Sequence, residues 1–354
     1  MAGASLAAFL PGATSRASAD CDSLEQAQSL KYNAPGRPLF GLVAPAARLS
    51  NERGYFARMA DEMSLFTLES DFQWSTMEPR PGEWDFRSTD EGVQFARSHG
   101  TLFAGHALYY HYFIPQWLRA SSDADALTQA LQSRIETTMT RYRGSIFRWD
   151  VVNEPLNARD GLSGGLRATS FSRTLGERYI DLAFRSARAA DPAALLCLNE
   201  AEFEYGDQQA KRDDLLALLR RLKDRGAPVD VLGIQSHLSA AKTFDFDSLR
   251  SFLTQVRALG LKVAVTELDV VDETLPADPS VRDRLVADHA QGYLRTVHDN
   301  SELIGVTCWG YSDRFTWLDM WHKRADGRPL RPLPFDFDLM RKPLWRVIRE
   351  TVSA

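Results

Sequence analysis

The feature that most constrains the fold is a set of eight short apolar runs that recur along the chain. They are centred near Phe40, Thr67, Phe103, Trp149, Leu196, Ile234, Val265 and Val306. Segments with apolar residues at helical spacing lie between them, at 53–63, 126–142, 175–190, 215–225, 248–259 and 282–298. Buried strands that alternate with amphipathic helices are typical of parallel β/α units, and eight such units close into a barrel. We therefore predict a single (β/α)8 TIM barrel of the α/β class.

The domain organisation follows from the composition along the chain. No linker, composition shift or low-complexity tract divides residues 20–354, so we expect one domain over that range. Residues 1–19 differ, because they are small and apolar and end in Ala17, Ser18 and Ala19. This A-x-A pattern is cut by signal peptidase. We expect an export signal over 1–19, a mature start at Asp20, and a periplasmic or secreted protein.

The expected positive charge is missing from the start of this segment. A sequence that begins inside a longer leader, for instance one of the twin-arginine type, would explain its absence. A disordered tail rich in Ala and Ser is the alternative interpretation.

Charge and cysteine content narrow the range of partners. The formal charge of -5 and the pI of about 5.9 provide no basic field for a nucleic acid, so we expect none as a partner. No stretch reaches the roughly eighteen apolar residues that a membrane span needs. Of the three cysteines, Cys197 and Cys308 lie in apolar runs, which favours buried thiols over a disulfide or metal ligands, and Cys21 lies near the start.

Polar and aromatic residues gather at the ends of the predicted strands. In a closed barrel the carboxyl ends of the strands share one face, where barrel enzymes keep their active sites. A single acid at a strand end is often only the N-cap of the next helix, but here the pattern repeats at seven strands. The residues are Glu69, His106, Asn153, Glu154, Asn199, Glu200, Gln235, His237, Glu267, Asp269 and Trp309.

Two of these carboxylates predict the chemistry. Glu154 lies in the sequence WDVVNEP, and Glu267 lies in VAVTELDV. Cleavage of a glycosidic bond needs two carboxyl groups, one to protonate the leaving oxygen and one to attack or stabilise the sugar. The sequence therefore predicts a glycoside hydrolase.

The same motifs resemble those of glycoside hydrolase family 10, whose known members are chiefly endo-β-1,4-xylanases. The resemblance runs from PLFGLVA to PLPFDFDLMRKPLWRVI, nearly the whole of 20–354. It implies a retaining barrel enzyme with Glu154 as acid/base, in W-D-V-V-N-E, and Glu267 as nucleophile, in T-E-L-D. In a retaining site the two carboxyl groups are about 5 to 5.5 Å apart.

The resemblance also implies supporting residues. His237 is expected to bind the nucleophile and to be oriented by Asp269, and Asn153 is expected to bind the sugar 2-hydroxyl. A core histidine, a loop amide and core tryptophans remain the alternative interpretations of these positions. The residues expected to bind substrate are Glu69, Gln73, His106, Tyr110, His111, Gln235, Trp309 and Trp317.

The chain departs from the family pattern where the substrate is held. The family motif E-N-x-x-K-W has Ser70 for its asparagine and Gln73 for its lysine. The motif W-H-S-Q has Tyr110 and Phe113 at its first and last positions, and N-D-Y-N has Ala201 in place of its tyrosine. The catalytic pair is unchanged, so we expect the chemistry to be kept and the specificity to differ.

The leading prediction is an endo-1,4-β-xylanase that acts as a monomer on polysaccharide or oligosaccharide, without a cofactor. The alternatives are a hydrolase of another β-linked polymer, such as a substituted glucan or a bacterial exopolysaccharide, and a glycan-binding barrel without activity. We expect no metal site, because His106, His111 and His237 come from separate segments and lack a ligand spacing such as H-x-H or H-E-x-x-H.

Overall fold

The computed structural model describes residues 28–32 and 36–354. The predicted export signal at 1–19 and Cys21 lie outside the described residues. Within the described part the strands are β1 (Leu39–Ala44), β2 (Leu65–Leu68), β3 (Leu102–Tyr110), β4 (Arg148–Asn153), β5 (Leu195–Glu200), β6 (Val231–Ile234), β7 (His237–Ser239), β8 (Lys262–Val271) and β9 (Leu303–Cys308).

The strands form a closed parallel barrel. They follow the order β6-β5-β4-β3-β2-β1-β9-β8-β7, and β6 also pairs with β8. Eight strands therefore complete the ring, while β7 is a short extra strand beside the end of β8, with His237 opposite Asp269. The predicted (β/α)8 barrel is confirmed. The sixth apolar run supplies two strands, because Ser236 has a φ of 64° and the chain turns there.

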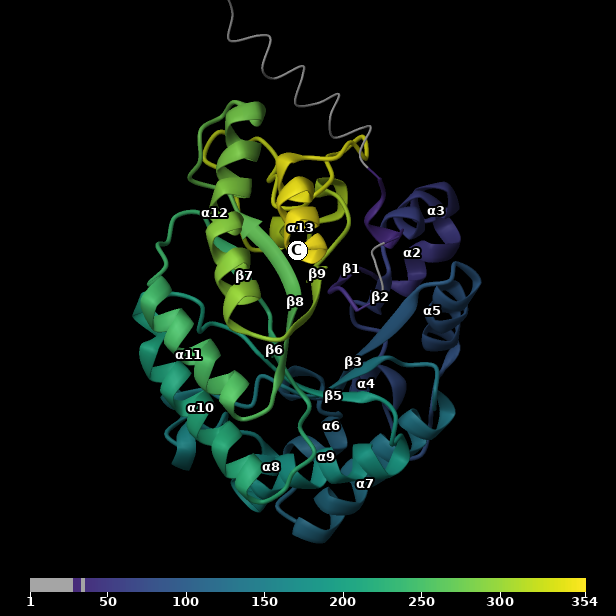
Figure 1. Cartoon of the computed structure of the whole chain (residues 1–354). Helices are drawn as coiled ribbons and strands as arrows, with labels where there is room; N and C mark the ends of the chain where they lie inside the picture. The colour runs from purple at the N-terminus through teal and green to yellow at the C-terminus, as the bar shows by residue number, and fades with distance from the viewer. Residues whose placement is uncertain (1–27, 33–35) are drawn as a thin grey trace, which may run out of the picture.

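Helices surround the barrel (Figure 1). They are α2 (Ala46–Asn51), α3 (Arg53–Glu62), α4 (Trp74–Met77), α5 (Arg87–Ser98), α6 (Gln116–Arg119), α7 (Ala124–Arg141), α8 (Ser170–Leu175), α9 (Arg178–Ala190), α10 (Gln209–Asp224), α11 (Phe246–Ala258), α12 (Pro279–Asn300) and α13 (Pro343–Ser353). The helix predicted over 175–190 is α9, which begins three residues later than predicted, because Gly176 ends the preceding helix α8 with a φ of 59° that a continuing helix does not allow. Helix α8 was not predicted.

Local sequence explains where these helices begin and which face they bury. The Asp123 side chain accepts hydrogen bonds from the backbone N–H groups of Asp125 and Ala126 at the start of α7. Leu127, Leu131 and Ile135 recur every four residues along α7 and are fully buried. This spacing turns one apolar stripe of the helix toward the barrel.

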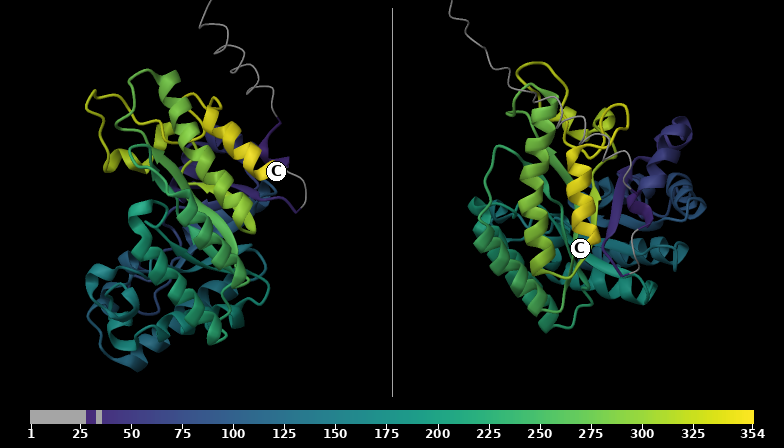
Figure 2. Two further views of the ribbon diagram at one scale, coloured as in Figure 1. Left: turned by 60° about the vertical axis from the view of Figure 1, so that its left-hand side comes forward. Right: turned by 45° about the horizontal axis from the view of Figure 1, so that its top comes forward.

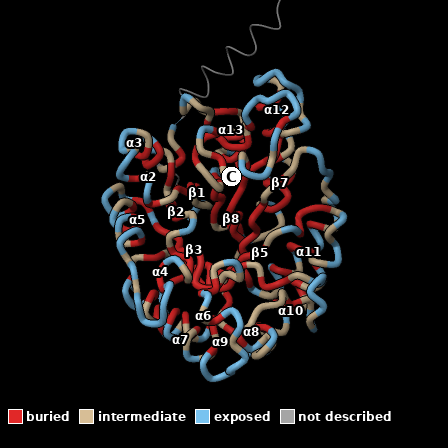
Figure 3. The backbone as a smooth tube through the Cα atoms, turned by 180° about the vertical axis from the view of Figure 1, so that it is seen from behind, coloured by how far each residue is buried: buried red, intermediate tan, exposed pale blue. Residues whose placement is uncertain are grey.

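The core lies in the barrel wall and between the wall and the helices. Every residue of β4 is buried, as expected for parallel strands that are covered on both faces. Figure 3 shows the same arrangement, with buried backbone in the strands and exposed backbone along the outer sides of the helices. Cys197 and Cys308 are buried free thiols, which confirms the prediction made for these two.

Buried ion pairs fix the long segment 309–342 between β9 and α13. The Lys342 ammonium lies 2.9 Å from Asp313 and 3.4 Å from Asp283, and Arg331 lies 2.6 Å from Asp283. Asp283 belongs to α12, which packs beside α13 (Figure 2). The segment is thereby tied to α12, and Lys342 at its end is the N-cap residue of α13. None of the helices in the described ranges has the length and apolar character needed to cross a membrane.

Candidate active site

The predicted site residues gather at the carboxyl ends of the barrel strands. Asn153 is the last residue of β4 and lies opposite Tyr110 of β3 and Asn199 of β5 in the sheet register. Glu267 was expected at a strand end but lies inside β8, since that strand continues to pair with β7. The pairing of β8 with β6 ends at Val265, so Glu267 still follows the part of β8 that closes the barrel.

Glu267 is buried and held at both carboxylate oxygens. Glu267 is 4% exposed. The Asn199 side-chain N–H donates to Oε1 at 2.7 Å, and His237 Nε2 lies 3.2 Å from Oε2. These two contacts fix the direction of the carboxylate, as a nucleophile requires.

His237 lies between two carboxylates. Its Nδ1 is 3.1 Å from Asp269 Oδ2, an oxygen that also accepts from Trp317 Nε1 at 2.8 Å. Burial by itself would lower the pKa of His237, but the charges and hydrogen bonds of Asp269 and Glu267 outweigh it and raise the pKa well above its usual value. A protonated His237 donates from both ring nitrogens and places a positive charge beside Glu267.

Glu154 adopts a backbone conformation that is rare for its residue type, with a φ of 51°. Its Oε1 accepts from the Tyr110 hydroxyl at 2.9 Å and from Gln235 Nε2 at 3.1 Å. Its Oε2 lies 3.5 Å from the Arg167 guanidinium. Three donors from three different segments therefore surround one carboxyl group, a degree of control that is typical of functional sites.

A chain of amide hydrogen bonds connects the two glutamates. Gln235 Nε2 donates to Asn153 Oδ1 at 3.2 Å as well as to Glu154. The Asn199 side-chain N–H donates to the same Asn153 oxygen at 2.9 Å as well as to Glu267. The two glutamates and the amides of Asn153, Asn199 and Gln235 thus form one polar network of five side chains. The positions of both carboxyl groups depend on these three amides.

His106 supports the floor of the site. Its Nδ1 lies 2.9 Å from Asp150 Oδ2, and Arg148 pairs with the other Asp150 oxygen at 3.3 Å. Burial favours a lower pKa for His106, but the hydrogen bond to Asp150 and the charge of Glu267 are together stronger and raise it. Its ring packs edge to face on Trp309, with centroids 5.1 Å apart.

Gln73 and His111, which were both predicted to bind substrate, have surroundings that differ from those of the other predicted residues. Gln73 is 1% exposed and its Oε1 has no hydrogen-bond partner among the described residues, so its side chain is not open to the cleft, whereas Ser70 is exposed. His111 Nδ1 lies 3.8 Å from Glu154 Oε2. Burial, with Arg167 adding to it, lowers the pKa of His111 to about 3, which keeps this imidazole neutral.

Sequence reasoning assigned no role to two residues of this site. Asn199 was noticed at a strand end, and that position was the signal that could have placed it beside the nucleophile. Arg167 lies in the loop after β4 and also donates to the Glu154 backbone oxygen at 2.9 Å. No spacing in the sequence indicated that contact. Within the described residues, no group of three or more His, Cys, Asp or Glu side chains is arranged to hold a metal ion.

Comparison with known families decides what the site belongs to. The family model described as Glycosyl hydrolase family 10 matches residues 29–351. The chain belongs to this family. The barrel is therefore that of a glycoside hydrolase of family 10, which agrees with the two glutamates at its carboxyl face.

Individual relatives agree with the family assignment. Endo-1,4-beta-xylanase A of Phanerodontia chrysosporium is 32% identical over 316 residues, which are 88% of this chain and 74% of that protein. Endo-1,4-beta-xylanase C of the same organism is 31% identical over 325 residues, or 91% and 78% of the two chains. The crystal structure of native xylanase 10B from Thermotoga maritima matches with a TM-score of 0.81 and 28% identity, and covers 92% of this chain and 98% of that one.

Proposed function

We propose that this family 10 enzyme is an endo-1,4-β-xylanase that cleaves xylan with retention of configuration. The observation that carries the proposal is the pair of glutamates, each held by its own donors and joined through Asn153 at the carboxyl face. The names of its relatives, which are endo-1,4-beta-xylanases about 30% identical to it, favour xylan as the polymer.

In the first step Glu267 attacks the anomeric carbon while Glu154 gives its proton to the glycosidic oxygen. The bond to the leaving sugar breaks, and a bond from Glu267 to the remaining sugar forms. His237 and Asn199 hold Glu267 in line for this attack. The negative charge left on Glu154 is met by donors from Tyr110 and Gln235, which are already in place.

In the second step Glu154 removes a proton from water, and the resulting hydroxide attacks the same carbon and releases Glu267. Asn153 is the candidate for binding the sugar 2-hydroxyl. Its amide oxygen is occupied by Gln235 and Asn199, so its N–H group remains to donate to a sugar oxygen. Trp309 and Trp317 supply flat apolar faces for the ring.

Product analysis tests this proposal. The protein from Asp20 onward is incubated with xylan, cellulose, mixed-linkage glucan and a bacterial exopolysaccharide under one set of conditions. Short xylo-oligosaccharides, with the β-anomer appearing first by NMR, are the expected result. Products of inverted configuration would contradict the mechanism, and binding of a polymer without products would indicate a glycan-binding protein instead.

A second candidate is hydrolysis of another β-linked polymer by the same residues. It is favoured by the substitutions in the substrate-holding segments, where Ser70 is exposed and the expected lysine is the buried Gln73. A sugar hydroxyl left without its partner costs about 1 to 3 kcal/mol, which is enough to disfavour plain xylan. Products from glucan or exopolysaccharide alone would support this candidate and exclude the xylanase.

We also propose that the enzyme is exported and acts as a monomer. Export is supported by the pattern at Ala17–Ala19, and N-terminal sequencing of the protein purified from its native cells should begin at Asp20. The monomer is supported by the small number of large apolar side chains that are exposed among the described residues, because they lie at four separate places in the sequence. They are Leu102, Tyr112, Leu285, and the adjacent Met320 and Trp321. Light scattering on the purified protein tests the monomer.

A further inference from the structure

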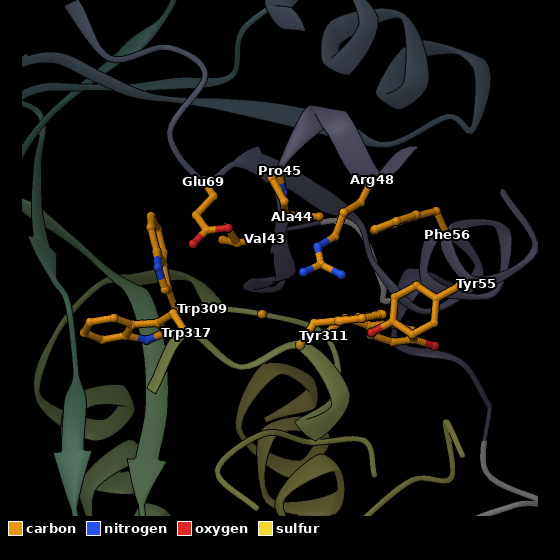
Figure 4. A pocket seen from close by; sticks show the side chains of 12 residues that line it. Val43, Ala44, Pro45, Arg48, Tyr55, Phe56, Glu69, Trp309, Tyr311 and Trp317 are labelled. Atoms are coloured by element: carbon orange, nitrogen blue, oxygen red, sulfur yellow. The ribbon is translucent and has the colours of Figure 1, made fainter. Parts of the chain in front are cut away.

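A pocket adjoins the active site between the end of β1 and the segment after β9 (Figure 4). Glu69, Trp309 and Trp317 belong both to this pocket and to the set of residues expected to hold the sugar chain. The other side chains are not part of that set. They are Val43, Ala44, Pro45, Arg48, Tyr55, Phe56, Tyr311 and Phe315.

Among the residues that the structure describes, Arg48 is the only cationic one that lines this pocket. Its guanidinium points into the pocket, toward the space between Glu69 and Tyr311 (Figure 4). The side chain is 40% exposed. Its guanidinium carbon lies 3.9 Å from the centre of the Phe315 ring, so the group is held by stacking.

Most of the hydrogen-bonding capacity of Arg48 is unused. The guanidinium has five N–H donors. In the described part of the chain it has one acceptor, Glu52 Oε1, at 3.4 Å from Nη1. A rigid, stacked and mostly unsatisfied fork of donors is suited to bind a carboxylate through two parallel hydrogen bonds.

The charges around the pocket divide it into two parts. The end of the pocket at Phe315, here called the outer wall, is lined by Arg48, whose carboxylate partner is Glu52. Arg314 does not line the pocket, but it also lies against Phe315, with its guanidinium carbon 5.2 Å from the ring centre. The inner wall has Glu69, a carboxyl whose pKa burial raises, although Arg48 opposes that shift. The inner wall therefore suits sugar hydroxyls, and the outer wall suits a negative group.

We propose that this pocket binds a carboxylate-bearing substituent of the polysaccharide, such as a uronic acid branch, and that Arg48 recognises it. The inference rests on the proposed function, because it requires a glycan chain that passes Glu69 and Trp309. The cation expected at position 73 is absent, because that residue is the buried Gln73, whereas Arg48 is a cation that lines the pocket.

The experiment compares glucuronoxylan with the same polymer after chemical reduction of its carboxyl groups to alcohols. The wild-type enzyme should show a higher kcat/KM on the acidic polymer, by up to about five-fold at low salt, the size expected for a partly exposed ion pair. The preference should shrink as salt screens the charges. Arg48→Gln should remove the preference, mainly through KM for the acidic polymer.

Arg53→Gln is the matched control, because Arg53 is an exposed arginine at the start of α3 that does not line the pocket. It should keep the preference. Equal kcat/KM on the two polymers in the wild type, or an equal preference in Arg48→Gln, would overturn the proposal.

Binding separates this proposal from the proposed function. If neither polymer is hydrolysed, the xylanase assignment fails, and the pocket is then tested with Glu267→Gln by affinity electrophoresis in gels that contain either polymer. Stronger retardation by the acidic polymer, lost on adding Arg48→Gln, would support the pocket. Equal retardation, or none in either gel, would overturn it.

Discussion

At the scale of single residues, the two glutamates are distinguished by the groups that hold them. Glu267 contacts an imidazole and an amide, and Glu154 contacts a phenol, an amide and a guanidinium. Glu267→Gln should abolish turnover of every substrate, because no covalent intermediate can form.

Glu154→Ala should spare the first step for aryl glycosides whose leaving group needs no acid. Pre-steady-state release of the aryl group measures this, and equal loss on activated and unactivated substrates would contradict the assignment.

Tyr110 is the residue where a departure from the family pattern touches the catalytic pair directly. Tyr110→Phe removes the hydroxyl that donates to Glu154 Oε1 at 2.9 Å and keeps the ring. We expect kcat/KM on polysaccharide to fall about ten-fold, the value of one hydrogen bond to a charged group, with a smaller fall for activated aryl glycosides. Tyr112→Phe is the control, since Tyr112 is 64% exposed and lies outside the polar network. Equal losses for the two variants would mean that the Tyr110 hydroxyl has no special role.

At the scale of elements, the helices depend on local signals that can be tested apart from catalysis. Asp123 caps α7 through two backbone N–H groups, both at 3.0 Å. Asp123→Ala should lower the free energy of unfolding by about 1 kcal/mol and leave kcat unchanged. Urea denaturation measures the change. Asp125→Ala should cost less, because Asp125 lies in the first turn, where its charge interacts favourably with the helix dipole, and it is not the cap. An equal cost for both variants would argue against the cap.

The elements also show how far the sequence could lead. The strand-helix alternation and the strand-end residues were predictable, because both follow from periodicity and from the single face on which parallel strands end. Helix α8 was missed, since its six residues are too few to show an apolar helical pattern. The burial of Gln73 and the contact of Arg167 with Glu154 depend on how loops fold over the barrel. No periodic pattern records such contacts.

At the scale of the whole molecule, the ion pairs behind the active site couple stability to pH. Asp313 is fully buried, and burial raises its pKa from 3.8 to about 6 although Lys342 opposes the shift. The folded protein therefore holds this proton more tightly than the unfolded chain does. The resulting stabilisation is fully present below about pH 4, the unfolded value, and is lost as pH rises through about 6.

Asp313→Asn should remove this dependence. The unfolding free energy of the wild type minus that of the variant should decrease by on the order of 2 to 3 kcal/mol from pH 4 to pH 7. The variant is therefore relatively more stable at the higher pH. Denaturant titrations across this range measure the difference, with the exposed Asp338→Asn as control. A constant difference would show that the buried carboxyl keeps an ordinary pKa. Because Asp313 precedes Trp317 in the segment after β9, a loss of activity that follows the same titration would mean that the ion pairs also position the aromatic wall of the site.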